Sequence, residues 1–153
     1  MPTVPSAELL GRAVALLARP GSRDEKLQRL CALLRDSVPH YQWVGFYLAE
    51  PEKRELVLGP FAGEPTEHVR IPYGRGICGQ AAERLAPFLV QDVTKESNYL
   101  ACSAKVKAEI VLPILKDGRF VAELDIDSHQ RAPFTPEDRK FLEEVCGAAA
   151  QVF

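Results

Sequence analysis

The sequence lacks several patterns that would each indicate a particular class of protein. No apolar run in its 153 residues reaches the roughly 18 that a membrane-spanning helix needs. The first residues lack the basic and apolar regions of a secretory signal peptide. The net charge is only −2 and both signs are interspersed, so no nucleic-acid-binding surface is indicated. We therefore expect a cytoplasmic protein that binds neither a membrane nor a nucleic acid.

Cysteine is sparse, and the four cysteines are widely separated. They form no CxxC or Cys/His pattern, so we expect no structural zinc site and no cofactor. In a reducing compartment they are free thiols. Cys31 and Cys146 fall on apolar helical stripes and are predicted to be inert core residues. Cys78 follows closely spaced glycines and Cys102 lies in a polar loop, so these two have the flexible surroundings that a reactive thiol needs.

The order of helix and strand signals predicts one α+β domain over residues 1–153. A central antiparallel sheet, with the N- and C-terminal helices packed on one face, suits this order. Ser22 and Glu25 form a capping box at a helix start, and Asp117-Gly118 indicates a tight hairpin. The expected helices span 6–18, 22–38, 80–85 and 135–149, and the expected strands span 41–50, 55–61, 69–72, 88–93, 109–116 and 119–128.

The segment Tyr73–Gly79 contains three glycines in seven residues. Such a segment permits tight backbone turns before a short helix, because glycine adopts conformations that other residues avoid. A phosphate-binding loop is the weaker interpretation, since the segment matches neither GxGxxG nor a P-loop.

Carboxylates alternate with aliphatic residues between positions 123 and 127. Successive side chains of a strand point to opposite faces, so Glu123, Asp125 and Asp127 are expected to share one face. The pattern alone favours a solvated face of an antiparallel sheet. The alternative is a buried cluster, joined by Glu109 from the neighbouring strand, that binds an ammonium group or keeps one acid protonated at neutral pH.

Trp43 and Tyr47 are four residues apart in a predicted strand, so both rings are expected on one face of the sheet. Packing in the core is the simpler interpretation of this pair. An aromatic wall beside a bound ligand is the alternative.

Seven segments together form a pattern that is more specific than any one of them. They are Trp43–Tyr47, Leu58–Phe61, Arg70–Gly79, Ala101–Cys102, Glu109–Pro113, Leu124–Ser128 and Phe134–Asp138. In these segments and their order the chain resembles the GAF-domain free methionine-(R)-sulfoxide reductases, over nearly its whole length after the second helix. Many GAF domains share the strand pattern, but not the combination of Cys102, Glu109, Asp125 and Asp127.

The resemblance implies a single GAF domain that reduces free methionine-(R)-sulfoxide by thiol chemistry. Cys102 would attack the sulfoxide sulfur and become a sulfenic acid, while Glu109 or Asp127 protonates the departing oxygen. The acidic residues would hold the ammonium of the free amino acid, and the aromatic residues would enclose its methyl sulfoxide end. The implied substrate-binding residues are Trp43, Tyr47, Glu109, Asp125 and Asp127.

The recycling step is where the sequence first departs from the family. Family members use a second cysteine to attack the sulfenic acid, and thioredoxin then reduces the disulfide. The usual resolving cysteine stands ten residues before the cysteine of the glycine segment, and this chain has His68 there. Cys78 could resolve in its place, or an external thiol could act directly. The resemblance thus implies a thioredoxin-type reductant as partner, and family members often form homodimers.

Glu123 is the second departure, because the family usually has an apolar residue at this position. Its carboxylate either adds negative charge to the pocket face or points to solvent near the hairpin end. A non-catalytic GAF domain that senses a small ligand remains the alternative function, motivated by His68.

Overall fold

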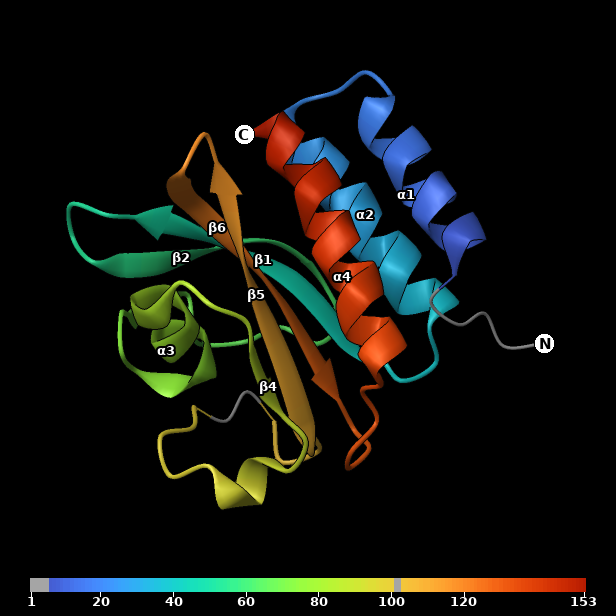
Figure 1. Ribbon diagram of the computed structural model, residues 1–153. Helices are drawn as coiled ribbons and strands as arrows, with labels where there is room; N and C mark the ends of the chain where they lie inside the picture. Colours follow the sequence, from blue (N-terminus) through green and yellow to red (C-terminus); the bar gives the residue numbers. More distant parts are fainter. Residues whose placement is uncertain (1–5, 101–102) are drawn as a thin grey trace.

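The computed structural model describes residues 6–100 and 103–153, which form a curled antiparallel sheet with helices on both faces (Figure 1). Six strands follow one another across the sheet in the order β3-β2-β1-β6-β5-β4. Every hydrogen-bonded strand pair is antiparallel. The strands are β1 (Trp43–Glu50), β2 (Glu55–Ala62), β3 (Arg70–Pro72), β4 (Phe88–Val90), β5 (Ala108–Lys116) and β6 (Arg119–Ser128). The α+β class predicted from the sequence is confirmed.

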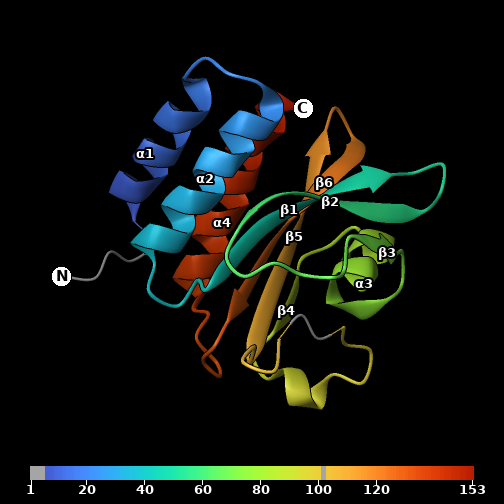
Figure 2. The same cartoon turned by 180° about the vertical axis from the view of Figure 1, so that it is seen from behind.

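Three helices near the chain ends cover one face of the sheet, as predicted. They are α1 (Ala7–Ala18), α2 (Arg23–Ser37) and α4 (Pro136–Ala149), and both views place them side by side (Figures 1 and 2). The Ser22–Glu25 capping box is present at the start of α2. Cys31 and Cys146 are buried in the core between these helices and the sheet, which confirms their predicted packing. Burial raises the pKa of both thiols.

Helix α3 (Gly76–Arg84) lies against the opposite face with the loops on either side of it (Figure 2). A second and separate core fills this layer, formed by α3 together with residues from the sheet. Its members include Trp43, Tyr47 and Val111 from the strands and Ile77 and Ala81 from the helix. The sheet therefore buries side chains on both faces.

Several element boundaries differ from the prediction. The helix expected at 80–85 spans Gly76–Arg84, and β4 ends at Val90, before a 3₁₀ turn at Val93–Lys95. The hairpin at Asp117-Gly118 is confirmed, with both residues at positive φ. No helix in the described ranges is both long and apolar enough to cross a membrane.

Candidate functional site

The predicted acidic and aromatic residues lie on the face of the sheet that α3 covers. Strands β1, β6 and β5 are neighbours, and residues directly opposite one another share a face. The register brings these residues into three adjacent rows. The rows are Trp43, Asp127 and Glu109; Gly45, Asp125 and Val111; and Tyr47, Glu123 and Pro113.

The solvated-face interpretation of the acidic strand is wrong. Glu109 is 5% exposed, Asp125 is 1% exposed and Asp127 is 2% exposed. The strand is paired on both sides, and α3 with its flanking loops covers the face toward which these residues point. The four acids, Glu123 included, therefore form a buried carboxyl cluster on one face of the sheet.

Glu123 lies on the pocket face and does not point to solvent, because its side chain is completely buried in the cluster. Neither of its carboxyl oxygens has a hydrogen-bond partner in the described parts of the chain. Burial first, and the nearby Asp125 second, raise the pKa of Glu123 well above its usual range. Glu123 in turn contributes to the raised pKa of Tyr73, after burial of that phenol.

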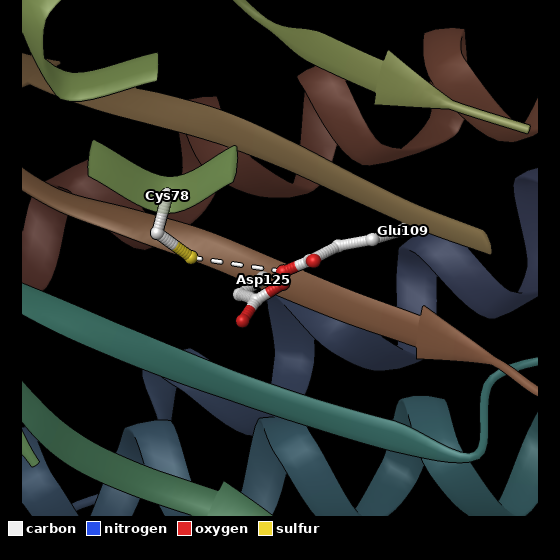
Figure 3. A group of neighbouring side chains, drawn as sticks. All are labelled: Cys78, Glu109 and Asp125. Atoms are coloured by element: carbon white, nitrogen blue, oxygen red, sulfur yellow. Dashed lines mark hydrogen bonds between the residues drawn. The ribbon is translucent and has the colours of Figure 1, made fainter. Parts of the chain in front are cut away.

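Cys78 does not have the flexible surroundings predicted for it. It is the third residue of α3, it is 5% exposed, and it points from the helix toward the sheet. Its thiol donates a hydrogen bond to Glu109, with 3.7 Å between Sγ and Oε2 (Figure 3). Burial raises the pKa of the Cys78 thiol, and the surrounding carboxylates, Asp125 foremost, raise it further. Cys78 is thus a protonated thiol held among acids.

The two aspartates of the cluster share the same electrostatic environment. Burial raises the pKa of Asp127 well above its usual range, and the charge of Asp125 adds to this effect. Burial also raises the pKa of Asp125, although hydrogen bonds with Glu109 and Cys78 act in the opposite direction. Burial therefore favours the protonated form of these carboxyl groups, and a protonated carboxyl group can act as an acid.

Trp43 and Tyr47 lie on one face, as predicted, and both are also part of the buried core. Their ring centroids are 6.4 Å apart. The Trp43 indole nitrogen donates a hydrogen bond to the Glu64 carbonyl (2.9 Å), and the Tyr47 hydroxyl donates one to the His68 carbonyl (2.8 Å). These bonds hold the loop between β2 and β3 against the cluster, so both aromatic residues also shape the walls of the site.

Two small cavities adjoin the buried carboxyl cluster. One of about 10 Å³ is lined by Cys78, Glu109 and Asp125, among others, and His68 contributes to its wall. The other, of about 80 Å³, is lined by Trp43 and Asp127, among others. A larger groove of about 810 Å³ lies elsewhere, at the hairpin turns and the end of α3, and contains none of the predicted site residues.

The predicted nucleophile, Cys102, lies outside the described residues. The residues on either side of the undescribed pair do contact the site: Leu100 lines the cavity at Cys78, and Ser103 lines the cavity at Trp43. Asn98 attaches the same segment to α3, because its side chain accepts a hydrogen bond from the Gly76 amide (2.8 Å).

Two glycines, Gly45 and Gly79, make room for the site. A Cβ on Gly45 would lie 2.3 Å from the Trp43 ring, so the missing side chain allows the indole to lie across β1 next to Asp125. A Cβ on Gly79 would lie 2.5 Å from the Pro72 carbonyl oxygen, so this glycine lets α3 approach the backbone near β3. A glycine inside a strand pattern indicates such a close approach, and this signal was present at Gly45.

Comparison with known proteins identifies related sequences and structures. The model of the GAF domain matches residues 21–153. Protein YtsP of Bacillus subtilis is 47% identical over 72% of this chain and 68% of its own length. The free methionine-R-sulfoxide reductase of Escherichia coli is 38% identical over 90% of this chain and 82% of its own length. The X-ray structure of free methionine-R-sulfoxide reductase from Neisseria meningitidis in complex with its substrate superposes with a TM-score of 0.90. It is 36% identical, and the match covers 95% of this chain and 86% of that one.

Proposed function

This chain belongs to the GAF-domain free methionine-R-sulfoxide reductases, and from that premise we propose that it reduces free methionine-(R)-sulfoxide to methionine. The observation that carries the proposal is the buried carboxyl cluster beside two aromatic residues. Asp125 and Asp127 take part in no ion pair found in the described ranges, so their buried carboxyl groups suit the ammonium of a free amino acid. A residue inside a polypeptide has no such ammonium.

In the proposed reaction, the Cys102 sulfur attacks the sulfoxide sulfur. A protonated acid of the cluster, Asp127 or Glu109, donates its proton to the departing oxygen. The oxygen passes to Cys102, so one thiol and one sulfoxide give one sulfenic acid and one sulfide. The contacts of Leu100 and Ser103 with the two cavities support this role for the segment that carries Cys102.

The proposed substrate contacts follow the chemistry of each side chain. Asp125 and Asp127, with Glu109, bind the ammonium by charge-assisted hydrogen bonds. Trp43 and Tyr47 contact the methyl sulfoxide end, where flat apolar rings bury the methyl group. Tight turns near the cluster supply backbone donors for the substrate carboxylate.

Recycling requires a second thiol, and we assign this role to Cys78. Its attack on the sulfenic acid forms a Cys78–Cys102 disulfide and releases water, and a thioredoxin-type dithiol then reduces the disulfide. A thiol with a raised pKa is a poor nucleophile, so it must lose its proton as it attacks. In this proposal Glu109 takes that proton, and the hydrogen bond that it accepts from this thiol supports the assignment.

The reaction is tested by measuring methionine released from pre-reduced protein and each epimer of free methionine sulfoxide. One equivalent from the R epimer without reductant, and repeated turnover with thioredoxin, are expected. Cys102→Ser should abolish release. Cys78→Ser should leave the single equivalent and slow turnover. Cys31→Ser serves as the matched control because it replaces another buried thiol away from the cluster. Unchanged turnover in Cys102→Ser would refute the assignment.

The ammonium site has its own test. N-acetylmethionine-(R)-sulfoxide keeps the sulfoxide but has no ammonium, so its kcat/KM should be lower by at least tenfold, the equivalent of about 1.4 kcal/mol. Asp125→Asn should lower kcat/KM for the free amino acid, so that kcat/KM for the free and the N-acetylated sulfoxide become more similar. Equal kcat/KM for the two substrates in the unmodified protein would refute ammonium recognition by the cluster.

A further inference from the structure

The residues around Cys78 have the composition of a metal-binding site. One donor atom each from Cys78, Glu109 and Asp125 lies within 4.8 Å of the other two (Figure 3). The three side chains come from α3, β5 and β6, and the two strands are hydrogen-bonded neighbours. The donors are thus held by regular elements of the fold, which fixes their relative positions without binding of an ion.

The distance between two of these donors fits a small tetrahedral ion. Zinc bonds to sulfur at about 2.3 Å and to carboxylate oxygen at about 2.0–2.2 Å, so a tetrahedral site separates sulfur and oxygen by roughly 3.5 Å. The Cys78 Sγ and Glu109 Oε2 atoms are 3.7 Å apart. These two donors therefore need only a small adjustment to bind one ion, and the Asp125 oxygen lies within 4.8 Å of both.

A further acid contributes an oxygen that the protein leaves unused. Asp127 Oδ1 and Asp125 Oδ1 are buried and have no hydrogen-bond partner in the described parts of the chain. Asp127 stands directly opposite Glu109 in the strand register and forms a side-chain hydrogen bond with it. A buried acceptor without a partner is destabilising, and a bound cation would offset that cost.

Charge and space both favour an ion at this position. No ion pair found among the described residues includes Asp125 or Asp127. The cavity that Cys78, Glu109 and Asp125 line measures about 10 Å³, which is about the volume one water-sized occupant needs. Arg75 also lines this cavity, but its side chain is exposed.

We propose that Cys78, Glu109 and Asp125, with Asp127 as the fourth ligand, bind one borderline-soft divalent cation of the zinc class in the reduced protein. A thiolate ligand selects such ions over magnesium and calcium, which prefer all-oxygen sites. Binding displaces the thiol proton to solvent, and the sulfur then bonds to the metal. Because the same carboxylates are assigned to the ammonium in the proposed function, the ion competes with the substrate. Only the competition with substrate depends on the proposed function, and binding of the ion does not.

Co²⁺ is the probe, because its bond to a thiolate gives a charge-transfer absorption band in the near ultraviolet. Pre-reduced, metal-free protein should bind one Co²⁺ per chain and develop the band, and Zn²⁺ should remove it. Cys78→Ser should lose the band, whereas Cys102→Ser and the control Cys31→Ser should keep it. Asp125→Asn should keep a thiolate band but weaken Co²⁺ binding by at least tenfold.

Three outcomes would overturn the proposal. They are no band in the unmodified protein, a band that survives in Cys78→Ser but disappears in Cys102→Ser, and displacement of Co²⁺ by equimolar Mg²⁺. Near-ultraviolet circular dichroism checks that Cys78→Ser folds, and Cys78→Ala provides a second variant without a ligand. The band requires no turnover, so it tests the metal site even if the reductase assay fails. Cys102→Ser cannot reduce the sulfoxide, so this variant is used to test the competition. Adding methionine-(R)-sulfoxide to it should weaken Co²⁺ binding, and an unchanged affinity would refute the competition.

Discussion

Replacing Glu123 with leucine should stabilise the protein, most strongly at alkaline pH. The Glu123 side chain is completely buried, and both its oxygens lack a hydrogen-bond partner in the described ranges. A buried polar group without a partner costs about 1–3 kcal/mol. Leucine removes that cost and adds apolar contact below α3. We therefore expect an increase of about 1–3 kcal/mol in the free energy of unfolding, which raises Tm by roughly 2–4 °C per kcal/mol for a domain of this size.

The pH dependence separates this explanation from a general gain in packing. The pKa of Glu123 is raised in the folded protein, so the folded state keeps the proton longer than the unfolded state. The contribution of this group to the free energy of unfolding is fully present below the unfolded-state pKa of about 4.3. It is lost as pH rises toward the folded-state pKa. Within that window the slope contributed by one group is at most about 1.4 kcal/mol per pH unit.

Urea unfolding at several pH values between 4 and 9 measures both effects. Asp125 and Asp127 also have raised pKa values and give slopes of the same sign, so the relevant quantity is the difference between variants. Glu123→Gln should lose the Glu123 slope but keep most of the burial cost, whereas Glu123→Leu should lose both. If Glu123→Gln has the same pH profile as the unmodified protein, the reasoning about this buried carboxyl is wrong.

Two further predictions concern the scaffold. Asp138 accepts hydrogen bonds from the Tyr41 hydroxyl (2.6 Å) and pairs with His40 (2.9 Å). Burial alone would raise its pKa, but these bonds hold the pKa below its usual value. Asp138→Asn should therefore lower the free energy of unfolding by about 2–3 kcal/mol near pH 7. In urea titrations this difference should shrink as pH falls below about 3.9, because Asp138 then becomes protonated. A difference that stays constant with pH would contradict the prediction. Gly79→Ala places a Cβ against a backbone carbonyl and should cost about 1–3 kcal/mol in thermal unfolding. The control Gly11→Ala places a Cβ in open space on a helix and should raise the free energy of unfolding by about 0.5–1 kcal/mol. Equal changes in the two variants would refute the steric argument.

Local signals were sufficient wherever a structure depends on near neighbours in the chain. The Ser22–Glu25 capping box and the Asp117-Gly118 hairpin both formed as predicted, because each needs only a few consecutive residues. The period-2 spacing of Glu123 and Asp125 also predicted correctly that they share a face, since side-chain direction in a strand is a local property. The family resemblance identified Asp125 by its combination with Cys102, Glu109 and Asp127, whereas Glu123 departs from the family pattern.

Only the tertiary structure decided what covers that face and what the acids do to one another. The alternation of acids favoured a solvated surface over a buried site, because the pattern carries no information about the layer that covers the strand. The placement of β6 between β1 and β5 brings Glu109 and the aspartates together, and α3 lies over them with Cys78 among the carboxyls. These contacts join residues up to about eighty positions apart in the sequence. Burial and the raised pKa values follow from that long-range packing, and no local pattern in the chain encodes them.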